Sequence, residues 1–147
     1  TLPVPLLTLD ELNGLAAEFV GDHMQTPPMV SAVKKDGVPL YKLARKGVEV
    51  QREPRLVHIY RFRFSSYADS VGHFELACTK GTYVRSVAHE LGQKVGCGAH
   101  LAALRRVSSG KFNVANALPL DAVLKLTTAE LEKRVIPFLK LAAGNSG

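Results

Sequence analysis

The residues best suited to chemistry form one short basic segment, Lys80-Gly81-Thr82-Tyr83-Val84-Arg85, which lies between a predicted strand and a predicted helix. The N-terminus of a helix presents free N–H groups and favours anions. A tyrosine and an arginine two positions apart on extended backbone project to the same side. Their guanidinium could hold a carboxylate or a phosphate while the phenol carries a proton or stacks on a base. A core tyrosine beside a surface arginine would give the same spacing.

Other catalytic and metal-binding patterns are weaker. Cys97 and His100 lie three positions apart, but two ligands do not make a metal site. No serine lies in a Gly-x-Ser-x-Gly elbow, and the glycines between residues 81 and 98 do not follow the dinucleotide-binding fingerprint. The sequence therefore favours neither a metal site nor a nucleotide cofactor.

The first half of the chain predicts a helix followed by an extended segment. Thr8 and Glu11 match a capping box, and apolar residues then recur at helical spacing until Gly21. Residues 25–29 must be extended because Pro28 restricts the residue before it. Residues 40–46, closed by Gly47, predict a short helix with basic side chains.

The second half predicts a hairpin and further helices. Residues 55–64 alternate, with His58, Tyr60, Phe62 and Phe64 on one face and Val57, Ile59, Arg61 and Arg63 on the other. Further along the chain we expect a turn over 65–72, a strand over 73–78, a helix over 84–95, a strand over 107–114 broken at Gly110, and a helix cap at 127–130. The fold class is α+β, with a mixed or antiparallel sheet and flanking helices.

The charge of the chain lies in two segments. The 147 residues carry a net charge of +6. Residues 34–63 hold nine basic and three acidic residues, and residues 80–111 hold six basic and one acidic residue. This predicts anionic partners, although solvated faces would give the same pattern. No apolar run reaches the roughly 18 residues of a membrane helix and no signal peptide is evident, so we expect a cytoplasmic protein.

Two blocks of motifs, in order, resemble the bacterial TruB family of tRNA pseudouridine synthases. The first is Gln25-Thr26-Pro27-Pro28-Met29-Val30-Ser31-Ala32-Val33-Lys34 with Gly37, Leu40-Tyr41, Ala44-Arg45 and Gly47; the second is residues 76–85 with 91–92, 96–101, 104–106 and 110–112. The resemblance runs from about Leu6 to Leu124. It departs at Val30, where an aromatic residue is common in the family.

The resemblance implies isomerisation of the T-loop uridine-55 of tRNA to pseudouridine, without metal or organic cofactor. It makes Tyr83 the pocket tyrosine and candidate base, Arg85 the partner of the catalytic aspartate, and Leu104 a wall of the base pocket. The implied partner is the T-arm of tRNA. Phosphate contacts are implied for Lys34, Lys35, Lys42, Arg45, Lys46, Lys80, Arg105 and Arg106.

The resemblance also implies a division of the chain. Residues 1–125 would be the C-terminal part of the catalytic domain, with an RNA-gripping segment at 25–50, and residues 126–147 a helical tail. The family's small C-terminal RNA-binding domain is not evident, unless residues 115–147 are its start.

The family's nucleophile is expected outside these residues. It lies in a Gly-x-Leu-Asp-x-x-Ala-x-Gly motif, a context that none of the aspartates Asp10, Asp22, Asp36, Asp69 and Asp121 has. Since the first residue is Thr1, we expect a C-terminal portion of a synthase, inactive alone, whose partners are the missing N-terminal segment or a second copy. The alternative is a noncatalytic RNA-binding module that lost the nucleophile.

Overall fold

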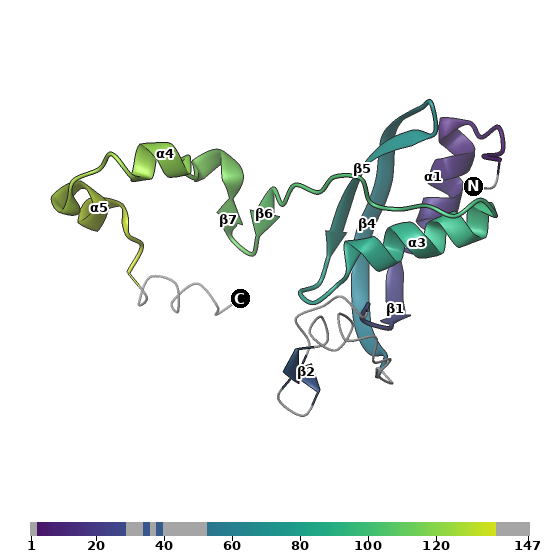
Figure 1. Cartoon of the computed structure of the whole chain (residues 1–147), viewed down its shortest axis with the longest axis horizontal. Helices are drawn as coiled ribbons and strands as arrows, with labels where there is room; N and C mark the ends of the chain where they lie inside the picture. The colour runs from purple at the N-terminus through teal and green to yellow at the C-terminus, as the bar shows by residue number, and fades with distance from the viewer. Residues whose placement is uncertain (1–2, 29–33, 36–37, 40–52, 138–147) are drawn as a thin grey trace. The chain divides into compact units, whose positions relative to one another are not determined.

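The computed structural model describes residues 3–28, 34–35, 38–39 and 53–137 (Figure 1). These residues belong to two compact units, Thr1–Ala103 and Leu104–Gly147. The predicted helix at 40–47 lies outside the described residues. Within the described ranges, no helix has both the length and the apolar character needed to cross a membrane.

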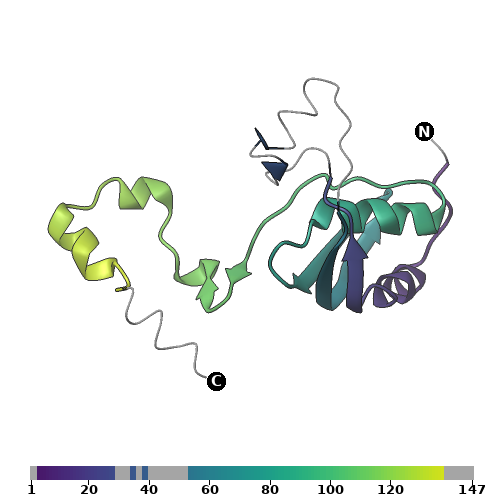
Figure 2. The ribbon, with the colours of Figure 1, turned by 90° about the horizontal axis from the view of Figure 1, so that it is seen from below.

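The first unit is a three-stranded antiparallel sheet with two helices on one face (Figures 1 and 2). The strand order is β1-β4-β5, and residues of both helices join the same buried cluster as residues of the sheet. Described strands pair antiparallel throughout, which confirms the predicted α+β class. The elements are α1 (Leu9–Ala17), β1 (Gly21–Gln25), β4 (Arg55–Ala68), β5 (Val71–Cys78) and α3 (Val84–Val95), with β2 (Lys34–Lys35) paired to β3 (Val38–Pro39).

Helix α1 begins at the predicted capping box. The Thr8 hydroxyl accepts the Glu11 N–H at 3.2 Å, and the Thr8 N–H donates to the Glu11 carboxylate at 2.8 Å. The hydrogen bonds from the Thr8 backbone and hydroxyl lower the pKa of Glu11 below its usual value. Leu12 and Ala16 are buried against the sheet, as the helical spacing predicts.

The predicted face assignment of the long strand is wrong beyond Ile59. Val57 and Ile59 are buried, but so are Phe62 and Phe64, which the alternation had placed on the opposite face. The reason is a β-bulge, because Ile59 pairs with Cys78 while Arg61 pairs with Ala77. A bulge inserts one extra residue and thereby inverts the alternation. Tyr60 is consequently 62% exposed.

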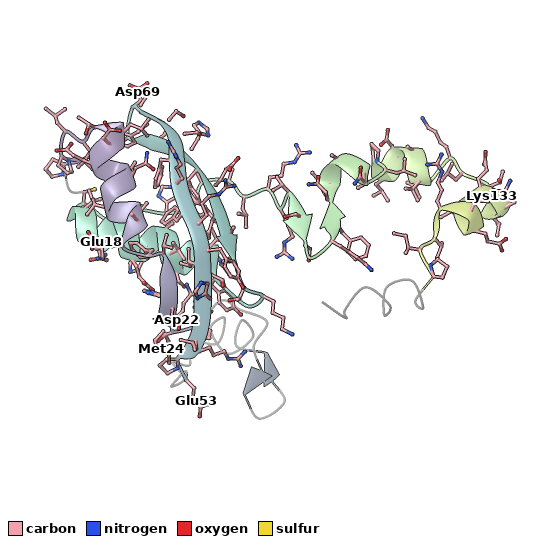
Figure 3. All side chains as sticks on the ribbon, turned by 180° about the vertical axis from the view of Figure 1, so that it is seen from behind. Glu18, Asp22, Met24, Glu53, Asp69 and Lys133 are labelled. Carbon is pink, nitrogen blue, oxygen red and sulfur yellow. The ribbon has the colours of Figure 1, made fainter. Side chains whose placement is uncertain are left out.

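The hairpin turn is shorter than predicted. Ala68 pairs with Val71, so the turn consists of Asp69 and Ser70, whose φ angles are 50° and 62°. Two positive φ values are typical of the turns that match the twist of a hairpin. The strands therefore run through most of the segment 65–72 that the sequence had assigned to a turn. Asp69 marks the tip of this hairpin, at the opposite end of the sheet from Met24 (Figure 3).

Helix α3 has the predicted bounds, and Gly92 lets the following loop fold back onto it. The helix ends at Gly96, whose φ is 88°. The Gly98 N–H then donates to the Gly92 carbonyl at 2.9 Å. A Cβ atom on Gly92 would lie 2.0 Å from the Ala99 nitrogen. Only glycine therefore fits at this position without moving backbone.

Alanine at the two helical glycines is expected to act in opposite directions. Gly92→Ala should lower the free energy of unfolding by about 1–3 kcal/mol, since the new methyl group meets backbone atoms. Gly14→Ala in α1 should raise it by about 0.5–1 kcal/mol, because nothing lies within 4 Å of the new Cβ. Urea unfolding followed by circular dichroism measures both. Equal effects of the two substitutions would contradict the close contact at Gly92.

The second unit, described through residue 137, consists of short elements. They are β6 (Ser108–Ser109), β7 (Phe112–Asn113), the 3-10 helix η1 (Val114–Asn116), α4 (Leu120–Val123) and α5 (Thr128–Arg134). The predicted strand over 107–114 is instead a small hairpin that turns at Gly110. The predicted cap is confirmed, with Thr127 and Glu130 forming a complete capping box. No residue of this unit within 104–137 is buried.

Candidate functional site

The junction between β5 and α3 is fixed by hydrogen bonds of two threonines. The Thr79 hydroxyl accepts the His58 N–H at 2.9 Å, and the Thr79 N–H donates to the His58 carbonyl at 2.9 Å. The Thr82 hydroxyl then donates to the Thr79 carbonyl at 2.9 Å. Between them Gly81 has a φ of 86°, which favours glycine. Lys80 is exposed in this turn.

Tyr83 is the N-cap of α3, and Arg85 is the second residue of the helix. Tyr83 has extended backbone, with φ −94° and ψ 102°, and its side chain makes no capping hydrogen bond. Its carbonyl accepts the N–H groups of Ser86 and Val87 at 3.0 and 3.2 Å. The expectation that Tyr83 and Arg85 share one extended segment is therefore wrong, because the helix begins between them at Val84.

The start of α3 is suited to an anion. The first turn of α3, which lies within the described residues, carries no acidic side chain. The positive end of the helix dipole lies here, together with the exposed side chain of Arg85. A carboxylate or phosphate at this position would meet both backbone N–H groups and a guanidinium. The helix end and Arg85 thus supply the positive charge that the sequence predicted for this segment.

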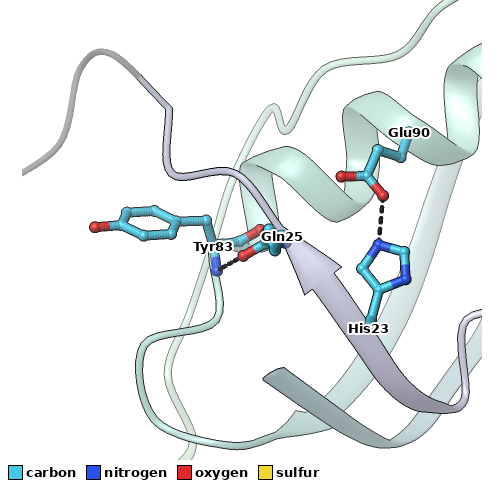
Figure 4. Close-up of polar contacts among 4 residues, drawn as sticks. All are labelled: His23, Gln25, Tyr83 and Glu90. Atoms are coloured by element: carbon cyan, nitrogen blue, oxygen red, sulfur yellow. Dashed lines mark hydrogen bonds and ion pairs between the residues drawn. The ribbon is translucent and has the colours of Figure 1, made fainter. Parts of the chain in front are cut away.

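Gln25, the last residue of strand β1, binds the backbone of Tyr83 through its side chain (Figure 4). The Tyr83 N–H donates to Gln25 Oε1 at 2.6 Å, and Gln25 Nε2 donates to the Tyr83 carbonyl at 3.1 Å. Gln25 is 1% exposed. The sequence resemblance places Gln25 at the start of the RNA-gripping segment 25–50, and no local signal links positions 25 and 83. This contact is what the sequence reasoning missed.

A second contact joins the same strand to α3. His23 Nε2 lies 2.6 Å from Glu90 Oε2, and both side chains are about one-third exposed. His23 and Gln25 lie on the same face of β1, which turns toward the helix (Figure 4). Strand β1 therefore contacts α3 both at its N-cap and two turns further along.

The remaining predicted site residues belong to other segments of the chain. Leu104 begins the second unit and is 63% exposed, and Arg105 and Arg106 beside it are exposed. Lys34 and Lys35 form β2. Lys42, Arg45 and Lys46 lie outside the described residues. Lys80, Tyr83 and Arg85 share the junction between β5 and α3, and the roles of all the predicted site residues stay predictions.

No metal centre is formed by the described part of the chain, in which no three His, Cys, Asp or Glu side chains come together. Cys97 is half-buried and His100 is exposed, in the loop after α3. The Cys97 thiol lies 3.4 Å from the Gly98 carbonyl.

The chain matches the models of two protein-family domains. One is the N-terminal domain of the TruB family pseudouridylate synthases, over residues 3–84, and the other is the tRNA pseudouridylate synthase B C-terminal domain, over residues 85–140. The boundary between the matches falls at the start of α3, between Val84 and Arg85.

Similar proteins bear related names. A tRNA pseudouridine synthase B of Opitutus terrae is 56% identical over 142 residues, which cover 97% of this chain and 59% of the relative. One of Stutzerimonas stutzeri is 45% identical over 120 residues, covering 82% of this chain and 39% of the relative. The chain therefore spans less than two thirds of the length of either relative.

A solved structure has the same fold. A chain of a crystal structure titled as a Cbf5-Nop10-Gar1 complex superposes with a TM-score of 0.58 and 29% identity, covering 75% of this chain and 28% of that chain. The family matches together span residues 3–140, and the identity to the Opitutus relative extends over nearly the whole chain. The chain belongs to the TruB family of pseudouridylate synthases.

Proposed function

We propose that the chain supplies the tyrosine and arginine half of the active site of a tRNA pseudouridine synthase. The observation that carries this is the start of α3, where Tyr83 is the N-cap and Arg85 the second helical residue of a first turn without acidic side chains. The names of the relatives give the substrate class. The substrate is the T-loop uridine of tRNA.

The reaction is an isomerisation that needs no redox partner. The bond between the ribose C1′ and N1 of uracil breaks, the base turns, and a bond forms between C1′ and C5. The C5 proton leaves, and N1 gains a proton. A carboxylate nucleophile assists at C1′, and Tyr83 is the candidate acceptor of the C5 proton. No metal or organic cofactor takes part.

Arg85 is assigned to the carboxylate nucleophile. A positive charge within a few ångströms favours the ionised form of a carboxylate, and the dipole of α3 adds to this effect. None of the five aspartates of this chain lies in the family's nucleophile motif. We therefore place the nucleophile in a polypeptide segment beyond these 147 residues, and expect the chain alone to be inactive.

RNA contacts are assigned to individual basic residues. Lys80 lies beside the site. By the family resemblance, Leu104 lines the pocket for the flipped base in the intact enzyme, and Arg105 and Arg106 follow it in the chain. The T-arm of tRNA would contact these residues, together with the lysines and the arginine of the segment 25–50. A tRNA substrate would place the protein in the cytoplasm.

Replacing Lys34 and Lys35 by glutamine should weaken tRNA binding and flatten its salt dependence. Each phosphate contact contributes about 0.7 to 0.9 to the slope of log Kd against log salt, so the double variant should lose roughly one to two units of slope. Filter binding at a series of salt concentrations measures the slope. An unchanged slope would contradict phosphate contact by these lysines.

The function can be tested in a hybrid enzyme, in which these 147 residues replace the matching segment of the Opitutus terrae relative. The hybrid is expected to release tritium from tRNA labelled at C5 of uridine, because it combines this chain with the remaining 41% of a relative of the same family. A hybrid that folds and binds tRNA but releases no tritium would favour a noncatalytic RNA-binding module.

A further inference from the structure

We propose that Gln25 is a positioning residue for Tyr83, which it holds through both backbone polar groups. This inference rests on the proposed function, since it concerns how the candidate base is oriented. Gln25 is a buried amide at the end of β1, and it contacts a residue 58 positions further along the chain (Figure 4).

Both polar atoms of the Gln25 side chain contact the same residue. Its oxygen accepts the Tyr83 N–H at 2.6 Å, and its nitrogen donates to the Tyr83 carbonyl at 3.1 Å. Among the side chains that the structure describes, Gln25 is the buried polar one. A buried amide without partners is strongly unfavourable, so this pairing selects one orientation of both groups.

This pairing determines where the phenol points. The backbone of Tyr83 cannot rotate without breaking one of the two hydrogen bonds, and the direction of a side chain follows from its backbone and a few rotamers. The Tyr83 ring projects away from the amide (Figure 4). The Tyr83 carbonyl also accepts two N–H groups of the first turn, so the same residue fixes the start of α3.

The chain contains a matched pair outside the candidate site. Asn13 of α1 accepts the Phe64 N–H at 2.8 Å and donates to the Phe64 carbonyl at 3.1 Å, with partners 51 positions apart. Phe64 is a buried core residue of β4. The side-chain amides of Asn13 and Gln25 therefore make the same two backbone hydrogen bonds. They differ in that Tyr83 belongs to the candidate site and Phe64 does not.

The first measurement is hydrogen exchange of individual amides by NMR on the 147-residue chain. Gln25→Met removes both hydrogen bonds and should accelerate exchange of the Tyr83 amide by about tenfold or more. Asn13→Leu should do the same to the Phe64 amide and leave Tyr83 protected. If the exchange rate of the Tyr83 amide is unchanged in Gln25→Met, the two hydrogen bonds do not hold Tyr83 and the inference is overturned.

The second measurement is the single-turnover rate in the hybrid enzyme. Gln25→Met should lower the rate of pseudouridine formation by about 10-fold to 100-fold, since small displacements of a reacting group have effects of that size. The dissociation constant for tRNA should stay within about threefold, because Gln25 is buried and the proposed RNA contacts of the segment 25–50 come from its lysines and arginine. Gln25→Glu, which keeps the acceptor for the Tyr83 N–H, should have an intermediate rate and serves if the methionine variant does not fold.

Asn13→Leu provides the control that separates positioning from stability. It should lower the melting temperature of the hybrid as Gln25→Met does, with an unchanged rate per folded molecule. If Gln25→Met and Asn13→Leu have equal rates in an active hybrid, the positioning role of Gln25 is overturned and the proposed function is not. A hybrid that is inactive without any substitution would overturn the proposed function and the catalytic part of this inference. The exchange measurement would still decide whether Gln25 holds the backbone of Tyr83.

Discussion

Arg85→Met in the hybrid enzyme is expected to lower the single-turnover rate of pseudouridine formation by about 10²–10³-fold, the range measured when one preorganised charge-stabilising group is removed. The dissociation constant for tRNA should change little. The reason is that Arg85 is assigned to the nucleophilic carboxylate and not to a phosphate. Without the guanidinium, the N-terminus of α3 still favours the ionised carboxylate, but the positive charge paired with it is lost. Rapid-quench measurement of tritium release and filter binding give the two quantities.

Two further variants sharpen the interpretation of Arg85. Arg85→Lys keeps the charge but loses the planar pair of donors, so it should restore part of the rate. Arg61→Met is the matched control, because Arg61 is an exposed cation paired with Glu75 at 2.8 Å in the sheet. It should leave the rate unchanged. Equal losses of rate and of tRNA affinity in Arg85→Met would contradict its assignment to the nucleophile.

Phe62→Ala is expected to lower the free energy of unfolding by about 3–5 kcal/mol, the usual cost of emptying a buried aromatic site. Phe62 is 4% exposed, and its ring lies 5.2–5.9 Å from those of Phe19, Phe64 and Phe74. Tyr60→Ala should cost less than about 1 kcal/mol, because that side chain is largely exposed. Chemical denaturation of the 147-residue chain measures both.

This pair of variants tests the bulge directly. Strict alternation along β4 would put Tyr60 and Phe62 on the same face, whereas the bulge puts them on opposite faces. If Phe62→Ala leaves too little folded protein, Phe62→Leu gives a smaller loss at the same site. A loss for Tyr60→Ala as large as that for Phe62→Ala would contradict the observed register.

The parts of the fold that the sequence predicted depend on neighbouring residues. The capping boxes at Thr8 and Thr127 and the glycine that ends α3 act within a few positions, so their patterns are visible in the sequence. The bulge at Tyr60 depends on how β4 pairs with β5. Alternation alone could not show it, because every residue from 57 to 64 except the arginines is apolar or aromatic.

In the candidate site, too, the sequence predicted the features that depend on neighbouring residues and not those that depend on packing. Tyr83 and Arg85 were predicted at a strand-to-helix junction, and the structure has that junction between Cys78 and Val84. The expectation that they share one extended segment was wrong, because α3 begins between them at Val84. Gln25 was not recognised because its contact with Tyr83 arises only when β1 and α3 pack together. The roles of Tyr83, Arg85 and Leu104 came from the family resemblance and stay predictions.

This chain is proposed to carry the tyrosine and arginine half of a uridine-isomerising site whose nucleophile lies in another segment. The most direct test is tritium release from tRNA labelled at C5 of uridine, measured for the 147-residue chain and for the hybrid enzyme at equal concentration. We predict release by the hybrid and none by the chain alone. Release by the chain alone, or none by a hybrid that folds and binds tRNA, would contradict the claim.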